Sequence, residues 1–353
     1  MKKWRRLSTL IATIGLLTVT VGLPFVSSPH DAAAADPKAI KLRYGNYAPK
    51  GAIDEPALWF ADEVSKRTGV KIELEAYYAG TLAKPPDCLD AIGKGVYHFG
   101  WISPVFTPAK IPLAIIPNSL PLVVPTLYTG LKAADEVVRT YPPAAAEYEK
   151  NNVKCLFHTG VWHYNLISKK PVKSLEDIKG LKVRTFGYLS KAWDELGGVP
   201  VTIPISQAYD ALQKGVIDGV LTQPYSMWKS TRLCEVAKSF TRMDLGCLPT
   251  PVIMNLDTWK KLPEKVQKEM LNVANEMPLV AEQIISKIEF DAIEGMKKEG
   301  IAMYEVGAAD KARMKEVAKS ITKIVVEDLT SKGIDRAKEV TDIYLKAIQK
   351  YEK

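Results

Sequence analysis

The segment from Lys173 to Tyr225 constrains the fold most, because strand-like and helix-like stretches alternate closely along it. A short apolar run at Leu181–Val183 precedes a helical repeat over 190–197. A second apolar run over 199–205 precedes another helical repeat over 206–212, and a third apolar run follows. This alternation predicts parallel strands in an α/β sheet, where ligands bind beyond the carboxyl ends of the strands.

Arg184 stands where the first of these strands ends. A guanidinium in that position can form two parallel hydrogen bonds with the carboxylate of a ligand. The simpler alternative is a structural ion pair with a nearby acid such as Asp177. The sequence therefore makes Arg184 the first candidate for a ligand contact, with the ion pair as the competing interpretation.

Four short patterns in fixed order carry a family resemblance. They read Leu175-x-Asp177-x-x-Gly180-Leu181-Lys182-Val183-Arg184, Ala208-Tyr209-x-Ala211-Leu212-Gln213, Val216-Ile217-Asp218-Gly219 and Leu262-Pro263-Glu264. Together they resemble the solute-binding proteins of tripartite ATP-independent periplasmic (TRAP) transporters, a family that includes receptors for C4-dicarboxylates and sialic acid. The resemblance implies an α/β, two-lobed periplasmic binding protein, type II-like, with a hinge and a long C-terminal bracing helix. It also implies that Arg184 clamps the carboxylate of the ligand.

The N-terminal residues are typical of a targeting segment. A basic start over 2–6 is followed by an apolar run over 10–23 and by three alanines at 33–35. We therefore expect a signal peptide over 1–35, cleaved near Ala35, and a periplasmic mature protein.

Two lobes are expected in the rest of the chain. Lobe I covers 36–160, with about 251–290 returning to it. Lobe II covers 161–250, with about 291–353 packing on or near it. A long amphipathic run from Pro263 toward Gly300 predicts the bracing helix.

Composition and motifs argue for binding and against catalysis. The net charge of +8 comes from lysines that alternate with acids, which is not typical of a nucleic-acid surface. Motifs for a hydrolase nucleophile, a phosphate loop, a dinucleotide or a zinc protease are absent. His158 and His163 lie near Cys155 without a zinc-like spacing, so packing roles are expected. We expect no enzyme activity, no cofactor and no metal.

The four cysteines leave a question open. Export permits disulfides, and Cys234 and Cys247 flank a short segment, so we slightly favour this pair. The alternative is that some or all four, with Cys88 and Cys155, are small buried residues.

One departure from the family narrows the expected ligand. Sialic-acid-binding members have a second Arg in the strand that enters lobe II, and Trp162 stands at the corresponding position here. The resemblance then implies one anionic anchor beside an aromatic wall. This favours a monocarboxylate with an apolar or aromatic remainder, such as a 2-oxo or 2-hydroxy acid.

Further ligand contacts are expected around Arg184. A strand over 96–102 leads to Trp101 and Ser103 on one side of the chain. Each aromatic candidate could instead belong to the core, and Ile205 and Tyr225 are weaker candidates. The expected contacts besides Arg184 are Trp162, Tyr47, Trp101, Ser103, Phe186, Thr222 and Gln223.

The sequence thus predicts a receptor that captures a small organic acid between two lobes. The resemblance implies TRAP membrane permease subunits as partners, no nucleic acid, and a monomer. The alternatives are a ligand-binding module for a membrane sensor, the receptor of an ATP-driven importer, or an enzyme on a related fold.

Overall fold

The structure is a computed structural model that describes residues 39–352. The predicted signal peptide over 1–35 lies outside the described residues. No helix within 39–352 is long and apolar enough to cross a membrane.

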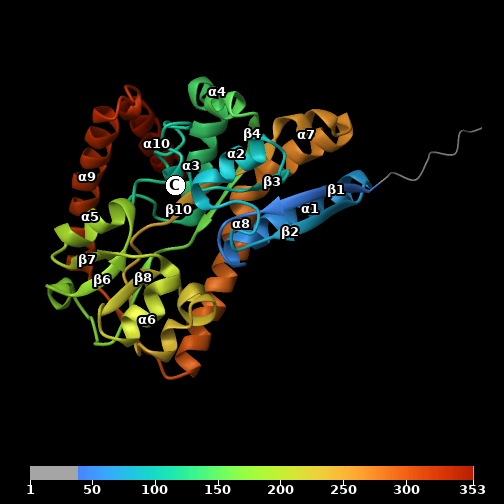
Figure 1. Ribbon diagram of the computed structural model, residues 1–353. Coiled ribbons are helices and arrows are strands. Elements are labelled where there is room, and N and C mark those ends of the chain that lie inside the picture. The colour runs from blue at the N-terminus through green and yellow to red at the C-terminus, as the bar shows by residue number, and fades with distance from the viewer. Residues whose placement is uncertain (1–38, 353) are drawn as a thin grey trace, which may run out of the picture. The chain divides into compact units, whose positions relative to one another are not determined.

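The first sheet has five strands in the order β2-β1-β3-β10-β4. β1 is parallel to β2 and β3, whereas β10 is antiparallel to β3 and β4. Figure 1 shows helices around this sheet, and the rings of Phe60, Phe99 and Phe157 pack together in its core. The strands are β1 (Ile40–Gly45), β2 (Ile72–Tyr77), β3 (Phe99–Trp101), β4 (Val153–Val161) and β10 (Leu248–Asn255). The helices are α1 (Glu55–Thr68), α2 (Cys88–Gly93), α3 (Leu127–Thr140), α4 (Pro142–Lys150) and α7 (Leu256–Lys261).

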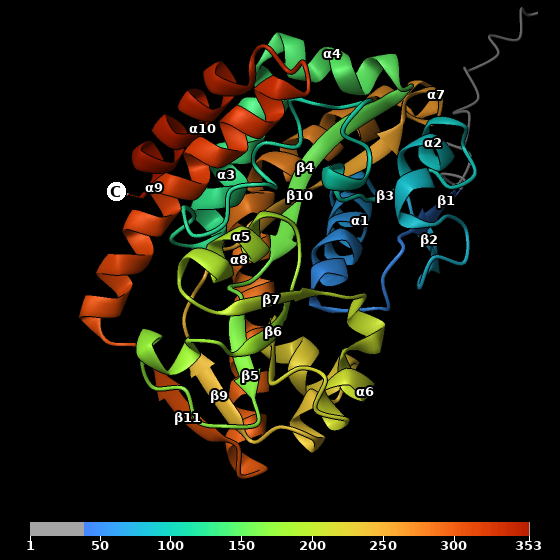
Figure 2. The same cartoon turned by 60° about the vertical axis from the view of Figure 1, so that its left-hand side comes forward.

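The second sheet has six strands in the order β11-β9-β5-β8-β6-β7. β6 is parallel to both β7 and β8, which confirms the parallel pairing predicted from the alternating pattern. Figure 2 shows this sheet and α6 beneath the strands of the first sheet. The strands are β5 (Asn165–Ser168), β6 (Lys182–Thr185), β7 (Val199–Thr202), β8 (Gly219–Thr222), β9 (Ser239–Arg242) and β11 (Ala302–Glu305). The helices are α5 (Gly187–Glu195) and α6 (Ala208–Gln213).

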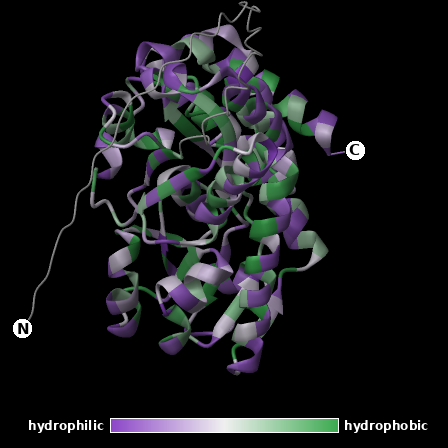
Figure 3. Ribbon diagram, turned by 90° about the vertical axis from the view of Figure 1, so that its right-hand side faces the viewer, coloured by the Kyte–Doolittle hydropathy of each residue, from purple (hydrophilic) through white to green (hydrophobic). Residues whose placement is uncertain are grey.

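A single long helix, α8 (Glu264–Lys298), runs along both sheets, as predicted. Its 35 residues correspond to about 52 Å at 1.5 Å per residue. It packs against α1, α3 and β4 of the first sheet and against the π-helical turn Ser226–Ser230 beside the second. Alternating apolar and polar segments along the helices in Figure 3 match this burial of one face.

Two helices complete the chain, as the sequence predicts. α9 (Ala308–Ser331) packs against α5, whereas α10 (Ala337–Tyr351) packs against α3. The lobe boundaries proposed from the sequence stay predictions. Short 3-10 turns connect the main elements at Ala52–Asp54, Pro85–Asp87, Pro104–Phe106, Leu175–Ile178, Ile205–Gln207 and Leu233–Glu235.

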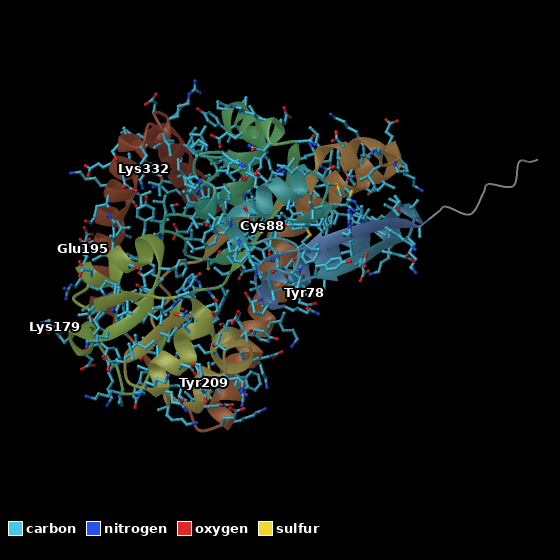
Figure 4. All side chains as sticks on the ribbon, in the orientation of Figure 1. Tyr78, Cys88, Lys179, Glu195, Tyr209 and Lys332 are labelled. Atoms are coloured by element: carbon cyan, nitrogen blue, oxygen red, sulfur yellow. The ribbon has the colours of Figure 1, made fainter. Side chains whose placement is uncertain are left out.

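All four cysteines are free, so the favoured Cys234–Cys247 pair is wrong. The two thiols lie in different hydrophobic clusters. Burial raises the pKa of Cys234 to about 12, as expected of a small core residue. Figure 4 labels Cys88, which is the buried first residue of α2 in the half of the chain built on the first sheet.

Candidate functional site

Arg184 lies on the central strand of three parallel neighbours. β6 places it opposite Val201 of β7 and Val220 of β8. Its Nε donates a hydrogen bond of 3.1 Å to the carbonyl oxygen of Ile203, just beyond the end of β7. The centre of its guanidinium lies 5.2 Å from the centre of the Phe186 ring, within the range of a cation–π contact.

The guanidinium of Arg184 has no carboxylate partner among residues 39–352. The proposed ion pair with Asp177 is wrong, because that carboxylate accepts the backbone N–H groups of Lys173 and Ser174 at 2.8 and 3.0 Å. Burial lowers the pKa of Arg184, since no anion compensates the lost hydration. A half-buried cation of this kind is available to an anion from outside the chain.

Polar and aromatic groups from the ends of β6 and β8 and from the residue before β5 gather beside Arg184. The Tyr164 ring lies 5.5 Å from the Phe186 ring, measured between centroids. Burial raises the pKa of Tyr164, while the charge of Arg184 and the side chain of Gln223 act in the opposite direction. The Thr222 hydroxyl donates to Oε1 of Gln223 at 3.2 Å. The second sheet thus supplies one cation, two rings and two hydrogen-bonding side chains.

Tyr47 belongs to the aromatic group on the first sheet. Its ring lies 4.8 Å from Trp101 and 5.5 Å from Phe106, in edge-on geometry. Burial raises the pKa of Tyr47; a hydrogen bond with Ser103 lowers it, and proximity to Tyr164 raises it. Tyr47 therefore adjoins the side chains of both sheets.

A buried carboxylate holds this aromatic group in place. Asp54 is fully buried and accepts hydrogen bonds from the Tyr44 hydroxyl and the Asn46 amide, both at 2.6 Å. Its other donors are the indole of Trp101 and the backbone of Gly51, both at 2.8 Å. Burial raises the pKa of Asp54, and these donors oppose the shift. The loop that carries Tyr47 and the end of β3 that carries Trp101 are thereby tied to one group.

Trp162 faces a different set of neighbours. Its ring lies 5.1 Å from Phe290 of α8 and 5.4 Å from His163, and only 4% of its surface is exposed. None of its aromatic contacts involves Arg184 or Tyr47. The structure brings the other seven candidates into two neighbouring groups and leaves Trp162 beside α8.

Residues 46–328 match the family of bacterial extracellular solute-binding proteins, family 7. The chain belongs to this family. Its members are transport receptors, not enzymes, so this chain is a solute-binding receptor of the TRAP type.

Solved and curated relatives agree over nearly the whole chain. A TRAP periplasmic solute-binding protein from Desulfovibrio salexigens is 28% identical, with a TM-score of 0.77, and the match covers 90% of this chain and 97% of that one. The C4-dicarboxylate-binding periplasmic protein of Rhodobacter capsulatus is 25% identical over 88% of this chain and 92% of its own.

A third relative shares the fold. A TRAP solute-binding protein from Rhodoferax ferrireducens, solved with copurified benzoate, is 24% identical with a TM-score of 0.75. That match covers 89% of this chain and all of that one.

Two surface depressions of the receptor lie away from Arg184. One, of about 460 Å³, is lined by Trp228 and by charged residues of α8 between Asp291 and Glu299. The other, of about 450 Å³, runs along the surface from Gly80 to Val96. Neither includes a predicted ligand contact, so neither coincides with the site of this receptor.

One of the two histidines near Cys155, His158, has a buried hydrogen-bond partner. His158 Nδ1 lies 2.7 Å from Asp135 Oδ1, and both groups are buried. This confirms the packing role expected for His158.

Two aromatic residues that contact the candidate residues, Tyr164 and Phe106, were not predicted from the sequence. Tyr164 stands in the irregular crossing between β4 and β5, where strand alternation no longer indicates direction. Phe106 lies at the start of a Pro-rich connection and is 44% exposed, so its composition indicated a loop and no contact. The aromatic residues after each strand end were the available signal.

Proposed function

We propose that this receptor captures a monocarboxylate with an apolar or aromatic remainder, such as a 2-oxo or 2-hydroxy acid. The observation that carries the proposal is Arg184, a half-buried cation with no carboxylate partner in the described chain and with Phe186 under its guanidinium. The carboxylate of the ligand binds this guanidinium through two hydrogen bonds, a contact worth roughly 1.5–3 kcal/mol in a desolvated site.

Aromatic rings form the surroundings of the remainder of the ligand. Phe186 and Tyr164 lie on the side of the second sheet, and Tyr47 lies on the side of the first. The side chain of Gln223, with the Thr222 hydroxyl, hydrogen-bonds a 2-oxo or 2-hydroxy group. Rings with a few convergent polar groups are the usual lining of a small-molecule site.

The single cation at the proposed site favours a ligand with one carboxylate over a dicarboxylate. Within residues 39–352, Arg184 is the one cation among the groups that shift the pKa values of Tyr164 and Tyr47, and Trp162 contacts Phe290 and His163. A second carboxylate would be buried without a counter-charge, which costs several kcal/mol. One relative is named as C4-dicarboxylate-binding, and the benzoate-bound relative is similar in fold alone, so this chain's own residues carry the proposal.

The receptor then delivers the acid to the membrane permease subunits of a TRAP transporter. It works as an exported monomer whose lobes close over the ligand. Closure buries the carboxylate and the guanidinium together and so strengthens their interaction.

A thermal-shift screen of residues 36–353 tests the proposal. The panel holds benzoate, phenylpyruvate, 4-methyl-2-oxopentanoate, succinate, malate and glucuronate, with wild type and Arg184→Ala measured side by side. A ligand at about 100 times its dissociation constant adds about 2.7 kcal/mol of stability. We expect the first three acids to stabilise wild type and not the variant. Shifts from dicarboxylates or glucuronate alone, or shifts that persist in Arg184→Ala, would overturn it.

A further inference from the structure

Two glutamates of α8 accept hydrogen bonds from backbone N–H groups, one in a helix beside the first sheet and one next to the second sheet. Glu282 Oε2 accepts the backbone N–H of Tyr128, in the first turn of α3, at 2.6 Å. Glu289 Oε2 accepts the backbone N–H of Tyr225, just after β8, at 2.7 Å. Seven residues make almost two helical turns, so both carboxylates lie on the same face of α8. The long helix is therefore bonded to α3 through one glutamate and to the segment after β8 through the other.

Burying the carboxyl group of Glu289 costs free energy, which a structural role of this group must offset. Only 3% of it is exposed, and none of the ion pairs within residues 39–352 includes it. Burial raises the pKa of Glu289 to about 8, opposed only by the Tyr225 N–H. The titratable group that faces it from another segment is the Cys247 thiol, which is itself buried and whose pKa is raised. A buried carboxyl group without a nearby cation lowers the stability of a fold unless hydrogen bonds compensate for its lost hydration.

The segment that Glu289 holds carries candidate ligand contacts. Tyr225 follows Gln223 by two residues, with Pro224 between them. The Gln223 carbonyl accepts the Met227 N–H at 3.0 Å, which turns the chain into the π-helical segment. The Gln223 side chain adjoins Thr222 and Tyr164. Fixing the N–H of Tyr225 therefore fixes the direction in which Gln223 leaves β8.

We propose that Glu289 is a positioning residue, which holds the 222–227 segment against α8 so that Gln223 and Thr222 face the ligand. The role in binding rests on the proposed function, whereas the hold on the segment does not. Because α8 also bonds α3 through Glu282, the ligand segment is fixed to the element that the two sheets share.

Two nearly isosteric variants test the hydrogen bond that Glu289 accepts from Tyr225. Glu289→Gln keeps an acceptor for the Tyr225 N–H, and Glu289→Leu removes it at similar volume. Hydrogen exchange of the ligand-free protein is followed by mass spectrometry at pH 7. We expect the peptide over 222–227 to exchange at least ~10-fold faster in Glu289→Leu and within ~2-fold of wild type in Glu289→Gln.

Glu282→Leu is the matched control. It should speed exchange at the start of α3 and leave 222–227 unchanged. Unchanged protection of 222–227 in Glu289→Leu would overturn the proposal, as would the same exchange pattern in Glu289→Leu and Glu282→Leu.

Binding of phenylpyruvate, measured by calorimetry, tests the consequence for the site. We expect a dissociation constant ~10-fold higher in Glu289→Leu and within ~2-fold of wild type in Glu289→Gln. Equal affinity in all three proteins would overturn the role in binding. If wild type binds no acid of the panel, the proposed function fails, and the exchange result alone decides whether Glu289 holds the segment.

Discussion

Arg184 has a ring and a carbonyl as neighbours and no carboxylate partner among residues 39–352. Its Nε is already bonded to Ile203, so the two terminal nitrogens remain for an anion. This geometry needs the planar fork of arginine, because a lysine ammonium offers a single point charge.

Arg184→Lys should therefore weaken binding of the preferred monocarboxylate about 10-fold or more while the fold stays intact. Calorimetric titration gives the affinity, and the circular dichroism spectrum without ligand checks the fold. An affinity equal to that of wild type would show that a point charge suffices and would contradict the bidentate contact.

The burial of Glu289 makes its contribution to the stability of the folded protein depend on pH. Its folded pKa is about 8, against an ordinary value of 4.5, so its contribution to stability is complete below about pH 4.5 and is lost as the pH rises to about 8. Glu289→Gln lacks this loss, so its stability relative to wild type should rise by roughly 5 kcal/mol across that range. Urea unfolding at several pH values measures the difference, and a difference independent of pH would contradict the buried carboxyl.

Glu147 has a pKa raised by burial to about 7, so wild type alone cannot isolate the effect of Glu289. The difference between wild type and Glu289→Gln removes this background, because Glu147 is present in both proteins.

At the scale of elements, the crossing between the sheets is the least regular part of the chain. The backbone N–H of Leu245 donates a hydrogen bond to the Tyr164 carbonyl, and the N–H of Tyr164 donates one to the carbonyl of Gly246, next to Leu245. Leu122 of the Pro-rich connection donates its N–H to the Leu245 carbonyl at 3.1 Å. Leu122 itself has a positive φ of 70°. Strained backbone that persists in this way is found where the surrounding structure fixes it, often near functional sites.

Gly246→Ala tests this crossing. Gly246 has a φ of +89°, and an added Cβ would lie 2.6 Å from the backbone nitrogen of Leu122. We expect a loss of about 2–4 kcal/mol in the free energy of unfolding. Gly300→Ala is the matched control, since its φ of +78° imposes similar strain but its Cβ would meet no atom within 4 Å. Equal losses in the two variants would show that the close approach to Leu122 has no effect.

Sequence patterns predicted the elements well where the signal was local. The parallel pairing of β6 with its neighbours, the length of α8 and the two final helices follow from periodicity and stop signals. The strand predicted over 96–102 is shorter, since β3 covers only Phe99–Trp101. Val96 instead closes a turn by bonding the carbonyl of Ala91.

Contacts over long sequence distances were beyond such reasoning. Trp101 was weighed as either wall or core, and its indole bonds buried Asp54 while its ring meets Tyr47. Its place in the wall of the ligand site stays a prediction. The direction of Trp162 depends on Phe290, more than a hundred residues away, and the separation of Cys234 from Cys247 depends on how the clusters pack. No local pattern encodes these facts.

On the scale of the whole molecule, the proposed ligand contacts come from both sheets, and in our proposal they meet when the lobes close. Tyr47 belongs to the first sheet and Arg184 to the second, and Tyr164 in the crossing adjoins both. α8 contacts both sides, so motion between them must be accommodated along this helix and the crossing segments. The receptor family shares this arrangement of two sheets and a bracing helix.

The central claim is that Arg184 recognises the carboxylate of the ligand, and a two-by-two comparison tests it most directly. Calorimetry would measure the monocarboxylate with the largest thermal shift and its neutral primary amide, each with wild type and with Arg184→Ala. We predict that wild type prefers the acid by at least ~100-fold, about 2.7 kcal/mol, and that the variant binds acid and amide almost equally. An undiminished preference for the acid in Arg184→Ala would contradict the account, because another group would then recognise the carboxylate.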